Sequence, residues 1–97
     1  MPVSCTADEA GQFVRRKDWY LKGNNVDSKT GLSVDDCQNW CAGFEGCRSF
    51  DYETGKQKCY LHKVVSSDNG VKMKEGKGNI YGELCSGMNT CTLNVLY

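Results

Sequence analysis

The sequence predicts an α+β domain in which one short α-helix packs on an antiparallel sheet of about five strands. The prediction rests on a capped helical segment at residues 33–43, on strand-like runs rich in aromatic residues, and on the placement of the cysteines. Four cysteines lie within residues 33–63, two in the helical segment and two at the heads of strand-like runs. The simplest geometry joins one helix to two strands through two disulfides.

Length and cysteine content indicate one small domain with covalent cross-links. The chain has 97 residues and seven cysteines. A domain of this size buries a modest core and gains stability from disulfides. Because disulfides persist in oxidising compartments, we expect a secreted or extracellular location, or a secretory organelle. A cytosolic metal site is the alternative, but Cys-x-x-Cys is absent and His62 lacks zinc-ligand spacing, so neither metal nor cofactor is expected.

Charge and composition argue against several other function classes. Twelve basic and 12 acidic residues give a net charge of zero, so no overall field attracts nucleic acid. No run approaches the ~20 apolar residues that span a bilayer, so no membrane insertion is expected. The chain has one histidine, His62, and no Gly-x-Ser-x-Gly motif. We therefore expect His62 on a strand surface and do not expect an enzyme.

The N-terminal part is expected to form a strand followed by a loop. Residues 1–12 should be irregular or an edge strand anchored by Cys5. Residues 13–22 are the first expected strand, whose aromatic residues and Leu21 can enter the core. Residues 22–31 are polar and rich in turn-forming residues, which predicts a loop before the helix.

The helix is expected to begin after Ser33, a natural N-cap followed by two aspartates in the first turn, where the helix dipole favours negative charge. Gly43 can adopt the left-handed conformation that ends many helices. Cys37 and Cys41 are four residues apart, so a helix places both thiols on one face. Trp40 is expected to pack beside that face.

After the helix the pattern changes to short strands. Strands are expected at residues 47–52, 59–65, 71–75 and 80–85, with turns at residues 54–56, 66–70 and 76–79. In the first of these strands, a period of two places Ser49 and Asp51 with Cys47 on one face, and Phe50 and Tyr52 with Arg48 on the other. Asn69-Gly70 favours a tight hairpin.

The central cysteine segment resembles the PAN/apple family, which includes the apple domains of plasma prekallikrein and of apicomplexan microneme adhesins and the N-terminal domains of plasminogen and hepatocyte growth factor. The segment reads Cys-x3-Cys from Cys37, then Cys-x-Ser-Phe-x-Tyr from Cys47, then Cys-Tyr-Leu from Cys59. The resemblance implies one PAN/apple domain over residues 1–88, with a short helix on a curved antiparallel sheet. Residues 89–97 would form a C-terminal tail or the start of a linker.

The resemblance also implies how the cysteines pair, which the sequence alone does not decide. The implied disulfides are Cys5–Cys85, Cys37–Cys59 and Cys41–Cys47. Cys91 is then left over. It could be a free thiol, link two chains as a disulfide dimer, pair within a following module, or replace Cys85 as the partner of Cys5.

As a function, the resemblance implies an extracellular binding or adhesion module that recognises a protein or a carbohydrate, within a secreted or cell-surface adhesin. A stand-alone secreted inhibitor, for example an anti-haemostatic one, is an alternative. A structural or dimerisation module is another.

The candidate ligand-binding residues are basic and form two groups in the sequence: Arg15, Arg16, Lys17, Lys22, Lys72, Lys74 and Lys77. Lys72 and Lys74 alternate with apolar residues and share one strand face, as in a contact strip for a sulfated glycan. The alternative is an ordinary solvated strand face. Aromatic side chains that could stack on a sugar ring are Trp19, Tyr52, Tyr60 and Tyr81, although most aromatics in so small a domain should be core.

Overall fold

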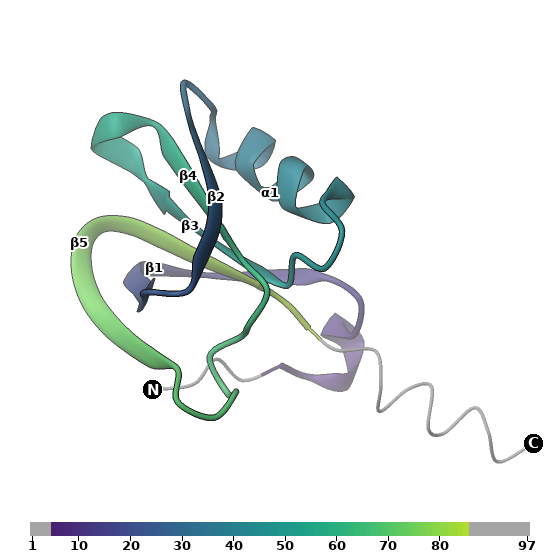
Figure 1. Ribbon diagram of the computed structural model, residues 1–97. Helices are drawn as coiled ribbons and strands as arrows, with labels where there is room; N and C mark the ends of the chain where they lie inside the picture. Colours follow the sequence, from purple (N-terminus) through teal and green to yellow (C-terminus); the bar gives the residue numbers. More distant parts are fainter. Residues whose placement is uncertain (1–4, 86–97) are drawn as a thin grey trace, which may run out of the picture.

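The fold is that of a computed structural model in which residues 5–85 are described. Five antiparallel strands form one sheet in the order β1-β5-β3-β4-β2. Helix α1 lies against this sheet (Figure 1). The predicted α+β class, with one helix on a five-stranded sheet, is confirmed. The elements are β1 (Phe13–Lys22), β2 (Asn25–Thr30), α1 (Val34–Gly43), β3 (Ser49–Glu53), β4 (Lys58–His62) and β5 (Lys72–Leu84), with short 3-10 turns at Ala7–Glu9 and Thr54–Lys56.

Helix α1 begins as its sequence predicts but ends differently. The Ser33 hydroxyl oxygen accepts a hydrogen bond from the Asp36 amide at 3.1 Å, as an N-cap does. The expected left-handed conformation at Gly43 is wrong, since Gly43 is the last helical residue and the cap at Phe44 is extended. The left-handed glycine lies later, at Gly46, with φ of 81°. Both helical cysteines face the sheet and are fully buried.

The segment between β1 and the helix was expected to be a loop, and that expectation is wrong. It contains β2, which pairs with β4 from Asn25 opposite His62 to Thr30 opposite Lys58. Every residue of β2 is exposed, so its side chains carry no alternation of apolar and polar residues. The strand is held at the sheet edge by its backbone pairing, which leaves no hydrophobic pattern in the sequence.

The expected strands at residues 71–75 and 80–85 are one continuous strand, β5. The expected turn between them is a bulge, where the register with β1 shifts between Lys17 and Trp19. Asp18 adopts a positive φ of 67°, and its carboxylate accepts a hydrogen bond from the Gly78 amide at 3.1 Å. Such a bulge bends a strand without ending it, and β5 runs as a long arc in Figure 1.

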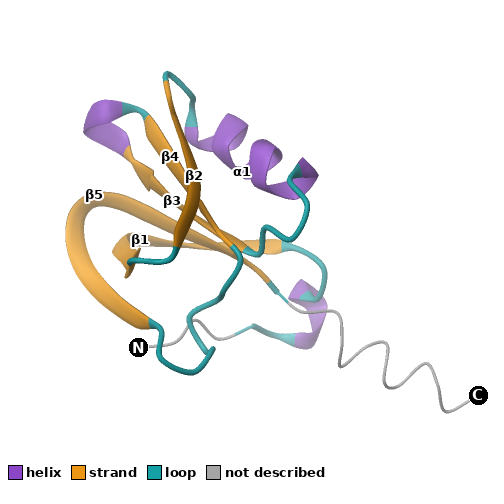
Figure 2. Ribbon diagram, in the orientation of Figure 1, coloured by secondary structure: helices purple, strands orange, loops and turns teal. Residues whose placement is uncertain are grey.

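The loop between β4 and β5 is not a tight hairpin, contrary to expectation. β3 lies between β4 and β5 in the sheet, so the loop must cross from one to the other. Figure 2 shows this long loop leading from β4 to the start of β5. Gly70 does adopt the positive φ that Asn-Gly favours, at 81°, but within this crossing loop.

The sheet is buried on both faces over β3, where Ser49, Phe50, Asp51 and Tyr52 are all buried. Phe50 and Tyr52 pack with the cysteines and Leu61 in the hydrophobic core beneath α1. The alternate residues of β3 point to the opposite face, which carries a buried polar layer.

Three disulfides tie these elements together, in the pairing that the resemblance implies. Cys5–Cys85 joins the N-terminal segment to the end of β5, Cys37–Cys59 joins α1 to β4, and Cys41–Cys47 closes the loop after α1. Cys91 and the expected domain boundary at residue 88 lie outside the described residues.

The contact between β5 and β3 requires a glycine at position 82. A Cβ atom on Gly82 would lie 2.2 Å from the Phe50 ring. Gly82→Ala is therefore expected to displace Phe50 and lower the free energy of unfolding by about 1–3 kcal/mol, as overpacked cores do. Gly43→Ala is the matched control, because its Cβ would meet no atom within 4 Å. Urea unfolding of both variants tests this, and equal stability of the two would contradict the packing argument.

Candidate functional site

The seven basic candidates all lie on β1 and β5, which are neighbours in the sheet. Lys22 lies opposite Lys72, and Tyr20 lies opposite Lys74. Residues that face each other across an antiparallel pair share a face, and so do alternate residues of one strand. Lys22, Lys72 and Lys74, here called the lysine cluster, therefore share one face of the β1–β5 pair. All three side chains are exposed.

The remaining basic candidates are not part of this cluster. The Arg15 guanidinium contacts α1, at 2.9 Å from Asp35 Oδ1 and 3.1 Å from Gln38 Oε1. This contact holds β1 to the helix. Arg16 points to the opposite face from Arg15 and Lys17, because adjacent strand residues alternate. Lys77 lies within the bulge of β5.

The second surface feature is a cavity of about 350 Å³, which the sequence did not reveal. Its lining comes from all five strands and the β1–β2 turn: Tyr20, Leu21, Gly23, Asn25, Asp51, Glu53, Tyr60 and Asn79. Asp51 and Glu53 alternate with the β3 residues that pack beneath α1. The cavity therefore opens on the sheet face opposite the helix.

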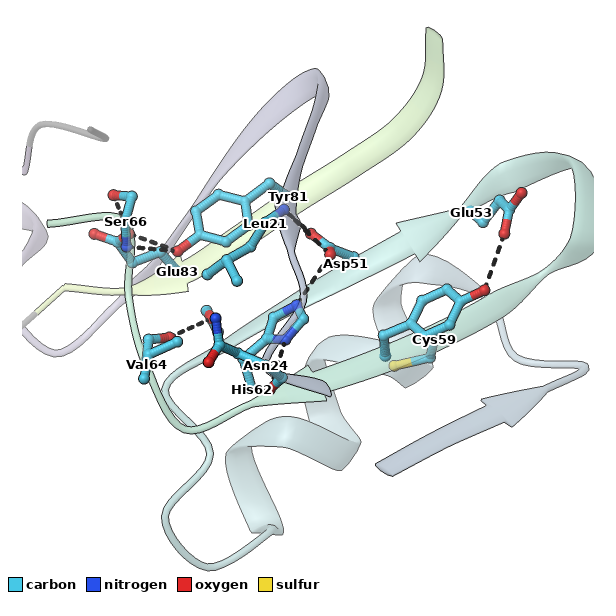
Figure 3. Close-up of polar contacts among 12 residues, drawn as sticks. Leu21, Asn24, Asp51, Glu53, Cys59, His62, Val64, Ser66, Tyr81 and Glu83 are labelled. Atoms are coloured by element: carbon cyan, nitrogen blue, oxygen red, sulfur yellow. Dashed lines mark hydrogen bonds and ion pairs between the residues drawn. The ribbon is translucent and has the colours of Figure 1, made fainter. Parts of the chain in front are cut away.

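One residue of the cavity lining, Asp51, forms a buried pair with His62, as Figure 3 shows. The Nε2 atom of His62 is 3.0 Å from Asp51 Oδ2. Asp51 also accepts a hydrogen bond from the Leu21 amide at 3.0 Å, and His62 Nδ1 lies 3.4 Å from the Asn24 carbonyl oxygen. The expectation that His62 lies on a strand surface is wrong, because the β1–β2 turn covers it and leaves 0% exposed.

The ring of His62 lies between two oxygen atoms, the Asn24 carbonyl oxygen near Nδ1 and Asp51 Oδ2 near Nε2. Burial raises the pKa of Asp51, against the opposing effect of His62 and the Leu21 amide.

A second polar cluster fixes the β4–β5 loop against β5. Tyr81 donates to Glu83 Oε1 at 2.7 Å, and the Ser66 hydroxyl donates to the same oxygen at 2.6 Å. Burial, then the hydrogen bond to Glu83, raises the pKa of Tyr81 well above its usual range. Tyr81 is 0% exposed, so it cannot stack on a ligand.

Among the other aromatic candidates, only Tyr60 reaches the cavity. Tyr52 is buried beneath α1, and its hydroxyl donates to the Leu32 carbonyl at 2.6 Å. Trp19 is half-buried and does not line the cavity. Tyr60 donates to Glu53 Oε1 at 3.1 Å. Burial, then Glu53, raises the pKa of Tyr60.

Comparison with known proteins decides the family. A family model described as the PAN domain matches residues 5–87. The chain belongs to the PAN domain family. This PAN domain is 30% identical to coagulation factor XI of Bos taurus over an alignment 105 residues long, which covers 98% of the chain. It spans 16% of the length of that relative. The solution structure of a PAN module from Eimeria tenella matches with a TM-score of 0.52 and 18% identity, covering 76% of this chain and 79% of that one.

The comparisons confirm the resemblance to the PAN/apple family and the fold that it implies. Members of this family are modules that bind proteins or carbohydrates in adhesins and coagulation factors, rather than typical enzymes. Within the described part of this PAN domain, no helix is long and apolar enough to cross a bilayer.

Proposed function

We propose that this PAN domain is an extracellular adhesion module of a larger protein, and that its lysine cluster binds a sulfated carbohydrate chain. The observation that carries the proposal is the register of β1 against β5. This register places Lys22 directly opposite Lys72, with Lys74 two residues further along the same face of β5. Three disulfides in one small domain support an extracellular location.

The lysine cluster is costly for the isolated fold. Like charges directly opposite on paired strands destabilise a sheet, by roughly 0.2–1 kcal/mol for such pairs. Within residues 5–85, no ion pair involves any of the three lysines. An anionic ligand lying along the lysine cluster would offset the repulsion between Lys22 and Lys72. Because the lysine cluster presents three positive charges side by side on one strand face, it suits a polyanionic chain better than a single small anion.

Removing two charges from the cluster should weaken binding to heparin, a sulfated chain. Lys72→Ala with Lys74→Ala is expected to elute from immobilised heparin at lower salt, with a shallower dependence of affinity on salt concentration, because fewer ionic contacts are made. The matched control is Lys56→Ala with Lys63→Ala. It removes the same charge from two exposed lysines elsewhere in the fold.

The two double variants separate local recognition from general attraction. A larger loss for the Lys72 and Lys74 variant supports the lysine cluster as the binding surface. Equal elution of both variants, or elution of both with the unaltered chain, would remove the support for a sulfated ligand. A protein would then be the favoured class of ligand.

A further inference from the structure

We propose that the cavity binds an organic cation, an ammonium or guanidinium group on an aliphatic stem such as a lysine or arginine side chain of a partner protein carries. The cavity lining shares no residue with the lysine cluster, although Tyr20 in the lining lies opposite Lys74. The proposal does not rest on the ligand of the cluster. The cavity of about 350 Å³ is large enough for one such side chain.

The first argument is the charge of the cavity lining. Two of the eight lining residues, Asp51 and Glu53, are acidic, and none is lysine, arginine or histidine. The other polar groups are two phenols and two carboxamides, which can accept hydrogen bonds from a cation. An anionic group would meet two carboxylates with no basic residue in the lining to balance them.

The second argument is that the charge of Asp51 is poorly compensated. Asp51 is only 4% exposed, and its known partners are the Leu21 amide and His62. Burial outweighs these partners, which is why its pKa is raised. A carboxylate has about four acceptor positions, so it can take a further donor. A cation in the cavity would supply both a donor and the missing positive charge, at low local dielectric.

The third argument is that two lysines of the chain already contact the lining groups near the cavity. Lys56 Nζ lies 3.7 Å from Glu53 Oε2, and its side chain is 70% exposed. Lys58 Nζ lies 5.1 Å from the centre of the Tyr60 ring, within the range of a cation–π contact. Exposed pairs of this kind contribute little. A better-placed cation from outside can therefore displace Lys56 from Glu53.

A neutral sugar is the competing ligand for a polar cavity with aromatic residues. It could use the carboxamides of Asn25 and Asn79 and the Tyr20 and Tyr60 rings. It would leave the charge of Asp51 uncompensated, however. Replacing one lining carboxylate by an isosteric amide therefore separates the two ligands, since only cation binding depends on the charge.

The test is an NMR titration of the full chain, following the amide signals of Leu21, Gly23 and Asn25. The probes are the blocked amino acids Nα-acetyl-lysine methylamide and Nα-acetyl-arginine methylamide, the uncharged Nα-acetyl-norleucine methylamide, butylamine, and galactose. Saturable shifts with the two cationic derivatives, and not with norleucine or galactose, are expected. Tighter binding of the lysine derivative than of butylamine assigns the source to a protein side chain, and the reverse assigns it to a free amine.

Two variants with effects of opposite sign sharpen the test. Glu53→Gln should weaken binding of the lysine derivative by about fivefold or more, since a partly buried charged contact is lost. Lys56→Gln should strengthen it, because an internal competitor for Glu53 is removed. Glu45→Gln, an exposed acid outside the cavity lining, should change nothing.

The proposal is overturned if galactose binds at least as tightly as the cationic derivatives, if Glu53→Gln leaves their affinity unchanged, or if no probe shifts the three amides. None of these outcomes bears on the lysine cluster, because its test uses heparin and the Lys72 and Lys74 variants, whereas this test uses cationic probes and the Glu53 and Lys56 variants.

Discussion

Replacing Cys37 and Cys59 together by alanine is expected to lower the free energy of unfolding by about 3 kcal/mol, the entropy that a cross-link of this span removes from the unfolded chain. The two cysteines are 22 residues apart and both are fully buried between α1 and β4. The loss is a large part of the ~5–10 kcal/mol that stabilises a domain of this size. Urea unfolding measures it.

The same variants test the pairing of the cysteines. With Cys91 replaced by alanine to prevent exchange, Cys37→Ala alone and Cys59→Ala alone should each cost nearly as much as the double replacement. Each single change already breaks the disulfide, so the effects cannot add. Additive losses, or a single variant as stable as the parent chain, would show that Cys37 and Cys59 do not pair.

Replacing Asp51 by leucine is expected to lower the free energy of unfolding by about 3–5 kcal/mol, which is the cost of removing one member of a buried ionic pair. Leucine has nearly the same shape but leaves the Leu21 amide and the His62 ring without partners. Asp51→Asn should cost under about 1 kcal/mol. Its carbonyl can accept from Leu21, and its amide can donate to His62 Nε2, while Nδ1–H donates to the Asn24 carbonyl.

Comparing the parent chain with Asp51→Asn at several pH values also reveals how the buried Asp51 carboxyl affects stability. Its pKa is raised above the ordinary value of 3.8, so the folded chain keeps a proton that the unfolded chain has released. This contribution to stability is complete below pH 3.8 and is lost as pH rises through the raised pKa. The parent chain should therefore lose stability relative to Asp51→Asn as pH rises in that window. A constant difference, or one that grows in the parent's favour, would contradict the assignment.

The elements with strong local signals could be predicted from the sequence. The Ser33 cap, the helical spacing of Cys37 and Cys41, and the aromatic strand after Cys47 each determine their own structure within a few residues. For this reason the helix start, β3 and β4 were expected nearly where they lie.

The elements that depend on distant partners were missed. β2 has six exposed residues and exists because its backbone pairs with β4, about 30 residues away along the chain. The glycines at 76 and 78 suggested a turn, but pairing with β1 keeps β5 continuous through a bulge. The sheet has the expected number of strands because the two errors cancel: β2 was not expected, and β5 was expected as two separate strands.

For the candidate site, too, individual residues could be predicted from the sequence but their arrangement in space could not. The basic residues were identified, but their convergence needs the β1–β5 register, which brings Lys22 beside Lys72 over 50 positions of sequence. The cavity had no sequence signal, since all five strands contribute to it. His62 looked solvent-exposed because nothing in its own strand indicates that the β1–β2 turn covers it.

The most direct test of the proposed function is to map where a ligand binds. The oxidised chain would be titrated with a short heparin oligosaccharide, and the backbone amide shifts followed by NMR at low and at physiological salt. We predict saturable shifts confined to the part of the β1–β5 pair around Lys22, Lys72 and Lys74, weakening as salt is raised. Shifts centred elsewhere, or none at low salt, would contradict the lysine cluster as the ligand-binding surface.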